Sequence, residues 1–364
     1  MPRIGRHLSV RPIVPMASES RVWSKIDLQK EGKQADYLRL PYSSNLSAYG
    51  WLPIPIVCIK NGEGPTALLV AGNHGDEYEG QIALLKLARR LQPDEIEGRI
   101  VVLPALNFPA VAAGTRNSPI DDGNLNRAFP GDPAGRPTEM LAHYVDEASF
   151  PIADIVVDLH SGGRSLEFLP CALMRPGPTP SADLAQRDAL RAFAAPISYI
   201  TSGKGGGGAT TLAAAAERHG VPTITAELGG GESVSRGGLD LAEAGLRRLL
   251  VQQGILKTVV PSAPAETRFM QVAGPHYFVY APSDGLFEPL VQLGESVACG
   301  QAAGRLHFPQ SPMKEPEIVS FEADGLVACR RVPAMTRHGD CLFHLLSDIA
   351  DGVDPMIGST ARER

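Results

Sequence analysis

One stretch, residues 67–80, constrains the fold of this chain more than any other, because a buried strand in it runs directly into polar side chains. The apolar run Ala67-Leu68-Leu69-Val70-Ala71 is long enough for one buried strand, and it is followed by His74 and, three positions later, by Glu77. A helical pattern of apolar residues then covers residues 81–91. In a parallel sheet, loops at the strand ends carry the polar groups that bind ligands. The stretch therefore predicts an α/β sheet with its chemistry at the strand ends.

His74 and Glu77 have the residue types and the spacing of metal ligands. An imidazole and a carboxylate three positions apart on a turn can point at one ion, and this pair suits zinc. His160 is a candidate third ligand, because it ends a second apolar run at residues 155–159. Two close ligands and a distant third are typical of hydrolytic zinc sites, which keep a fourth position for water. Each histidine alone could instead be a partly buried structural residue. Together they predict one zinc ion per chain.

Glu227 ends a third strand-like run, residues 221–226, and is followed by glycines 229–231. A strand end at the same side of the sheet would bring its carboxylate to the metal ligands, and the glycines would leave room for a substrate. A carboxylate beside a metal-activated water can take its proton and pass it to a leaving amine. We therefore predict that Glu227 is the general base. The alternative is a structural ion pair at a strand end.

The segment 107–136 has little apolar periodicity and many Gly, Pro, Asn and Asp residues. A loop of this length inside a compact domain is usually functional. It contains Arg116 and Arg127, and a guanidinium group can hold a substrate carboxylate or stabilise a developing oxyanion. Surface salt bridges are the alternative interpretation of both arginines.

The order of strand and helix patterns predicts an α/β fold in which a mixed sheet is flanked by helices. A buried strand at residues 99–104 follows the first strand and helix, which implies a right-handed crossover. Alternating residues between 21 and 61 predict strands at one edge of the sheet. Further helices are expected at residues 138–148, 182–193, 210–219 and 239–253.

The last hundred residues differ from the rest, and Pro261-Ser262-Ala263-Pro264 marks the change. Residues 277–289 and 319–327 alternate apolar and polar side chains, and each segment contains an Asp-Gly turn. They predict two related halves of a small, all-β, lipoyl-like barrel that covers one wall of the active site. We accordingly expect three parts, listed here: a flexible N-terminal arm (1–20), a zinc-dependent catalytic domain (21–262) and a C-terminal β domain (263–364). A carrier module modified at Lys314 is an alternative, although its spacing and the Glu-Pro that follows do not fit well.

Charge and cysteine content narrow the class of protein. The formal net charge of −6 and the lack of a basic stripe argue against a nucleic-acid partner. The longest apolar runs are only long enough for strands, so no membrane span is expected. Five scattered cysteines without a CxxC pair suggest reduced thiols and a cytoplasmic location. We expect a small-molecule substrate and a homo-oligomer, guessed to be a dimer.

Four motifs together resemble the succinylglutamate desuccinylase and aspartoacylase family, which is related in fold to zinc carboxypeptidases. They are His-Gly-Asp-Glu at 74–77, Asn-Leu-Asn-Arg at 124–127, Asp-Leu-His-Ser-Gly at 158–162 and Glu-Leu-Gly-Gly at 227–230. The resemblance implies zinc binding by His74, Glu77 and His160, and activation of water by Glu227. It also implies that Arg116 polarises the amide carbonyl, while Asn126 and Arg127 bind the substrate α-carboxylate.

Within that family, the residues of these motifs resemble those of the ectoine-degradation branch. Its members remove acetate from N2-acetyl-L-2,4-diaminobutanoate. The resemblance therefore implies an amidohydrolase for an N-acyl amino acid. Aspartoacylase, desuccinylase or carboxypeptidase activity is the alternative. The diaminobutanoate substrate carries a free ammonium group, so we expect a spare carboxylate in the pocket. The candidates for it are Asp121, Asp122, Glu167 and Glu232.

Overall fold

The structure is a computed structural model of the whole chain, and it describes residues 20–201, 207–258 and 266–349. The predicted N-terminal arm, except Ser20, lies outside the described residues. So does the predicted boundary at residues 262 and 263. The division into three parts therefore stays a prediction.

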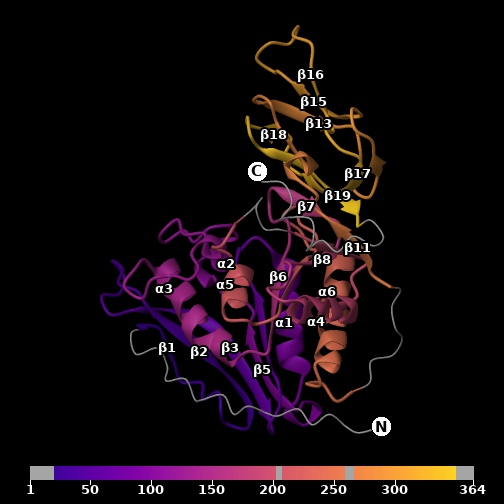
Figure 1. Ribbon diagram of the computed structural model, residues 1–364. Helices are drawn as coiled ribbons and strands as arrows, with labels where there is room; N and C mark the ends of the chain where they lie inside the picture. The colour runs from indigo at the N-terminus through magenta and orange to yellow at the C-terminus, as the bar shows by residue number, and fades with distance from the viewer. Residues whose placement is uncertain (1–19, 202–206, 259–265, 350–364) are drawn as a thin grey trace, which may run out of the picture.

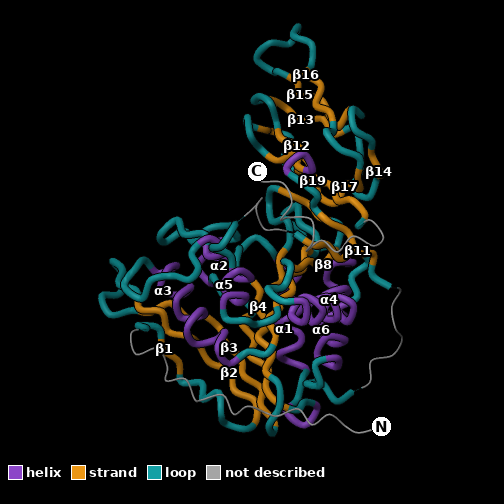
Figure 2. The backbone as a smooth tube through the Cα atoms, in the orientation of Figure 1, coloured by secondary structure: helices purple, strands orange, loops and turns teal. Residues whose placement is uncertain are grey.

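A large mixed sheet forms the centre of the protein, as expected for an α/β fold (Figures 1 and 2). Its first part, in spatial order, contains these strands: β1 (Trp23–Ser24), β2 (Gly32–Pro41), β3 (Trp51–Asn61), β5 (Gly98–Leu103), β4 (Thr66–Ala71), β6 (Ile155–His160), β10 (Thr223–Glu227), β8 (Cys171–Met174) and β9 (Ile197–Ile200). The four strands β5, β4, β6 and β10 are parallel neighbours, whereas β1 to β3 extend the sheet in antiparallel fashion. The predicted edge strands between residues 21 and 61 are thereby confirmed.

Helices cover both faces of this sheet, which is why its central strands are apolar throughout. One face carries α1 (Tyr78–Arg90), α4 (Pro180–Phe193) and α6 (Arg236–Gln252), and the other carries α2 (Phe108–Ala113), α3 (Pro137–Tyr144) and α5 (Leu212–Arg218) (Figure 1). Successive residues of β4 belong to different cores: Leu69 packs under the first helix group and Leu68 under the second. The predicted helices are confirmed, but the one expected over 138–148 changes to a π-helical turn at Val145–Ser149. Short 3₁₀ turns lie at Pro93–Glu95, Leu125–Arg127, Phe150–Ile152 and Pro275–Tyr277.

The C-terminal strands form a second β region. They are β11 (Arg268–Gln271), β12 (Phe278–Tyr280), β13 (Gly285–Pro289), β14 (Ser296–Val297), β15 (Ala302–His307), β16 (Glu317–Ser320), β17 (Gly325–Arg331), β18 (Met335–Thr336) and β19 (Cys341–Asp348). Strands β13, β15, β16 and β18 make a small antiparallel sheet, while the others join the large sheet. The two Asp-Gly turns do not close hairpins. Each carries the chain from one sheet to the other. Apart from β11, each half of the region gives two strands to each sheet.

The large sheet is continuous from the first strands into this β region. β11 pairs in parallel with β9 and in antiparallel fashion with β19, and β7 (Leu166–Phe168) pairs with β17. β19 is thereby placed two strands from β9, the last strand of the first part of the sheet (Figure 1). No helix among the described residues is long and apolar enough to cross a membrane.

Candidate metal centre and its pocket

Three parallel strands bring the predicted site residues to one end of the sheet. His74 follows β4 and Glu77 immediately precedes α1, while His160 and Glu227 are the last residues of β6 and β10. The register pairs Ala71 with Leu159, and His160 with Glu227. Because parallel neighbours end at the same side, polar residues far apart in the sequence lie together.

Two glycines let the turn after β4 hold its shape. Gly72 has a φ of +71° and Gly75 donates its backbone N–H to the Thr115 carbonyl at 2.8 Å. A Cβ atom on Gly75 would overlap the Ala110 carbonyl. The turn therefore packs directly against the backbone of residues 110–115, and this contact fixes His74 relative to the loop that carries Arg116.

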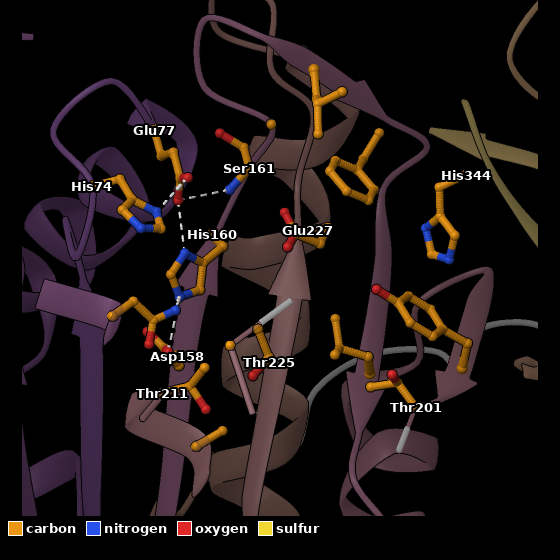
Figure 3. Close-up of a pocket in the computed structure, with 18 of the residues that line it drawn as sticks. His74, Glu77, Asp158, His160, Ser161, Thr201, Thr211, Thr225, Glu227 and His344 are labelled. Atoms are coloured by element: carbon orange, nitrogen blue, oxygen red, sulfur yellow. Dashed lines mark hydrogen bonds and ion pairs between the residues drawn. The ribbon is translucent and has the colours of Figure 1, made fainter. Parts of the chain in front are cut away.

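His74, Glu77 and His160 form a compact, buried group (Figure 3). Nδ1 of His74 lies 2.7 Å from Glu77 Oε1, and Nδ1 of His160 lies 2.8 Å from Glu77 Oε2. One ligand atom from each residue can be chosen so that all lie within 4.8 Å of one another. Both rings thus direct their Nδ1 atoms at the Glu77 carboxylate. In this arrangement the three side chains can bind one divalent cation together.

The outer nitrogens of both rings are already satisfied. His160 Nε2 lies 2.9 Å from Asp158 Oδ2, and Asp158 Oδ1 accepts a hydrogen bond from Asn73 at 2.9 Å. His74 Nε2 lies 3.2 Å from Asn124 Oδ1. If each Nε2 carries the proton, each Nδ1 keeps a lone pair for a metal ion. The donor set therefore fits a metal ion, and two nitrogens with one carboxylate suit zinc.

Burial and charge shape the proton affinities of this group. Burial raises the pKa of Glu77, but His74 and His160 outweigh it and hold that pKa below its usual range. Burial also opposes protonation of His160, yet Asp158 and Glu77 raise its pKa well above the ordinary value. For His74 burial prevails and lowers the pKa.

Glu227 is a buried carboxylate beside these ligands, with Oε2 unpartnered among the described residues. Burial raises its pKa to about 8, while His160 opposes and Glu77 adds to the increase. Figure 3 places Glu227 beside His160 and inside the pocket. A carboxylate with a high proton affinity and a free oxygen is suited to accept a proton.

Arg116, Asn126 and Arg127 all line the same cavity of about 320 Å³. Arg116 Nη1 lies 3.4 Å from His74 Nδ1, so this arginine reaches the candidate metal ligands. Asn126 Nδ2 lies 3.4 Å from His160 Nε2, and burial lowers the pKa of Arg127. The cavity is thus lined by each of the seven predicted site residues, while their individual roles stay predictions.

The expected spare carboxylate is absent from the described lining of the cavity. Asp121 instead binds the backbone and hydroxyl of Thr138. Glu167 is paired with Arg330, and Glu232 is paired with Arg164. Asp122 does not line the cavity either. That expectation was wrong because Asp121, Glu167 and Glu232 are bound to other partners.

Sequence reasoning missed several residues that shape the site. Asp158 carries a readable signal, since it lies two positions before His160 and strand alternation puts both side chains on one face. Asn73 immediately precedes the motif at 74–77, and Asn124 is the first residue of the motif at 124–127. His344, Tyr199 and Phe278 also line the cavity, but they come from β19, β9 and β12. No local pattern connects these three residues to the site.

Comparison with known proteins agrees with the fold. Residues 63–252 match the family described as "Succinylglutamate desuccinylase/Aspartoacylase catalytic domain". The N-alpha-acetyl-L-2,4-diaminobutyric acid deacetylase of Halomonas elongata is 36% identical over 323 residues, which cover 89% of this chain and 94% of that protein.

Solved structures of similar proteins superpose over nearly the whole chain. The product-bound ectoine utilization protein EutE (DoeB) from Ruegeria pomeroyi is 39% identical, with a TM-score of 0.86 and coverage of 90% of this chain and 99% of that one. A succinylglutamate desuccinylase/aspartoacylase from Rhodobacter sphaeroides is 38% identical, also with a TM-score of 0.86, and covers 91% and 100% of the two chains. The chain is therefore an enzyme of the succinylglutamate desuccinylase/aspartoacylase family.

Proposed function

We propose that this enzyme is a zinc-dependent deacetylase that hydrolyses N2-acetyl-L-2,4-diaminobutanoate to acetate and L-2,4-diaminobutanoate. The observation that carries the proposal is the convergence of His74, Glu77 and His160 beside Glu227. The near full-length similarity to the Halomonas deacetylase and to the Ruegeria ectoine utilization protein supports the choice of substrate.

His74, Glu77 and His160 would hold one zinc ion and leave a position open toward the cavity. When bound there, zinc polarises the acyl carbonyl and lowers the pKa of a water molecule. Asp158 and Asn124 keep the two imidazole rings in the orientation that this binding needs.

Glu227 acts as the base and then as the acid. Its free oxygen accepts the proton of the attacking water and holds it until the amide bond breaks. The same carboxyl group then donates the proton to the leaving α-amine. This role requires the amide nitrogen, and with it the substrate Cα, to lie beside Glu227.

The two arginines have different tasks. Arg116, close to His74 and Glu77, would stabilise the negative charge that develops on the acyl oxygen. Arg127 and Asn126 would bind the α-carboxylate of the substrate, because they line the cavity on the side of α5. The substrate is then fixed at its carboxylate and at its acyl group.

A substrate screen on metal-analysed protein tests the proposal. We expect one zinc per chain and the highest kcat/KM with N2-acetyl-L-2,4-diaminobutanoate, compared with acetyl-aspartate, succinyl-glutamate and short peptides. A chelator should abolish acetate release and added zinc should restore it. Full activity of metal-free protein would refute the mechanism, and preference for acetyl-aspartate or succinyl-glutamate would refute the substrate.

Two further expectations belong to this proposal. All five cysteines are free thiols, which supports work in a reducing cytoplasm. The expected homo-oligomer is tested by light scattering of the purified protein. Intact-mass measurement tests the carrier alternative, because modification of Lys314 would add a fixed mass.

A further inference from the structure

His344 is a buried histidine in the active-site cavity that the proposed chemistry does not use. It lies on β19, is only 5% exposed, and its Nε2 has no hydrogen-bond partner among the described residues. A buried polar atom without a partner costs free energy, and such atoms concentrate at functional sites. We therefore expect the free Nε2 of His344 to bind a ligand.

Aromatic rings from three other strands frame the imidazole. Phe278 stacks on it with ring centroids 4.4 Å apart and planes at 2°, while Tyr199 and Phe168 meet it edge-on at 5.9 and 6.5 Å. The pairing of β7, β17, β19 and β12 aligns Phe168, Cys329, His344 and Phe278 in one row across the sheet. All three rings line the cavity. His344 is therefore held rigidly in an aromatic frame.

The electrostatics of this frame favour a cation over an anion. Burial lowers the pKa of His344 to about 4, so the ring is neutral at pH 7 and offers one lone pair. Aromatic faces attract an ammonium group and disfavour a carboxylate. The carboxylates among the described lining residues are Glu77, Asp158 and Glu227, which already serve the metal site. Arg175, which also lines the cavity, is bonded to Glu217.

The stereochemistry of the substrate places its side chain in this part of the cavity. If Glu227 protonates the leaving amine, Cα lies beside Glu227, and the α-carboxylate points toward Arg127. Figure 3 shows His160 and the metal ligands on one side of Glu227 and His344 on the other. The acetyl group occupies the metal side. The substituent left on Cα, the side chain, then extends toward His344.

We propose that His344, framed by Phe168, Tyr199 and Phe278, is the specificity residue that accepts the side-chain ammonium group of the substrate. The assignment rests on the proposed deacetylase function and explains how an amine can be recognised without a dedicated carboxylate. It also predicts discrimination against acidic side chains, because a neutral imidazole and aromatic faces offer no positive charge to them.

The test compares two substrates that differ only by the amine. N2-acetyl-L-2,4-diaminobutanoate carries it, and N2-acetyl-L-2-aminobutanoate does not. Wild type, His344→Phe and His344→Gln are assayed for kcat/KM with both compounds. We expect His344→Phe to lower kcat/KM for the amine substrate by about 10- to 100-fold, the effect of a lost hydrogen bond to a charged group. The value for the other compound should stay within about twofold. His344→Gln keeps an acceptor oxygen and should lose less.

The controls separate recognition from folding. His307→Phe makes the same exchange at an exposed histidine of the small sheet and should change neither value. Zinc content and melting temperature are measured for each variant. If His344→Phe does not fold, the comparison of the two substrates is made with His344→Gln alone. Equal losses with both substrates, or no loss with either, would overturn the assignment. Wild-type protein that releases no acetate from the amine substrate overturns the proposed function, and the assignment falls with it.

Discussion

The exchange Asp158→Asn tests whether the hydrogen bond between Asp158 and His160 orients this proposed metal ligand. Asp158 uses Oδ2 for His160 Nε2 at 2.9 Å and Oδ1 for the amide of Asn73 at 2.9 Å. With the Asn73 amide in its present orientation, the new amide oxygen faces Asn73, because Asn73 Nδ2 donates there. The new NH₂ group then faces the Nε2–H of His160, and two donors oppose each other. His160 loses its orienting bond and can place its proton on Nδ1, where the metal should bind.

The expected size of this effect follows from the contact that is lost. A partner of a metal-bound histidine contributes about 10- to 100-fold to metal affinity, or about 1.4–2.7 kcal/mol. Because Asp158 is buried and its bond is charge-assisted, we expect the upper part of this range. The zinc Kd is measured by competition with a chromophoric chelator at fixed pH.

A matched control accompanies this measurement. Asp154→Asn makes the same exchange at the opposite end of β6, where the carboxylate accepts from the backbone of Thr66. Its zinc Kd should equal that of wild type. If Asp158→Asn also binds zinc within about twofold of wild type, the orienting role of Asp158 is refuted.

Three further predictions have defined outcomes. Glu227→Gln should keep one zinc per chain and lower kcat by about 10²–10⁴-fold, and normal turnover would exclude Glu227 as the base. Gly238→Ala should reduce the free energy of unfolding by about 3 kcal/mol, because its Cβ would overlap the Leu228 carbonyl. Gly237→Ala, with open space around its Cβ, should leave stability unchanged or raise it by up to about 1 kcal/mol. Denaturant titrations check both. For His344, the folded pKa of about 4 lies below the ordinary 6.5, so the unfolded chain binds the extra proton. Stability should therefore fall between pH 6.5 and 4 by about 3 kcal/mol more than in His344→Phe, and parallel curves would contradict this.

The central strands and the candidate metal ligands could be predicted because the sequence patterns that indicate them are local. The run before His74 is an uninterrupted apolar strand, the run before His160 is broken only by Asp158, and each ends in small or polar residues. Parallel pairing then forces those ends together, so His74, Glu77 and His160 could be joined without knowing any distance.

The wall around His344 could not be predicted in the same way. Phe168 and His344 meet through pairings of β7 with β17 and of β17 with β19, which join residues far apart in the chain. The spare carboxylates were assigned from composition alone, and Glu167 and Glu232 turned out to be paired with arginines. Long-range register and competition between partners are properties of the folded chain, and neither leaves a short sequence pattern.

The pairing of β11 between β9 and β19 has a practical consequence for anyone who shortens this protein. Cutting the chain after α6 would strip β9 of its neighbour and leave unpaired N–H and C=O groups along it, a template for aggregation. It would also remove Phe278 and His344 from the wall of the cavity and expose the cavity to bulk water. Residues up to the end of α6 are therefore expected to precipitate or to lose substrate discrimination when expressed alone, even though all the proposed metal ligands and Glu227 remain in them.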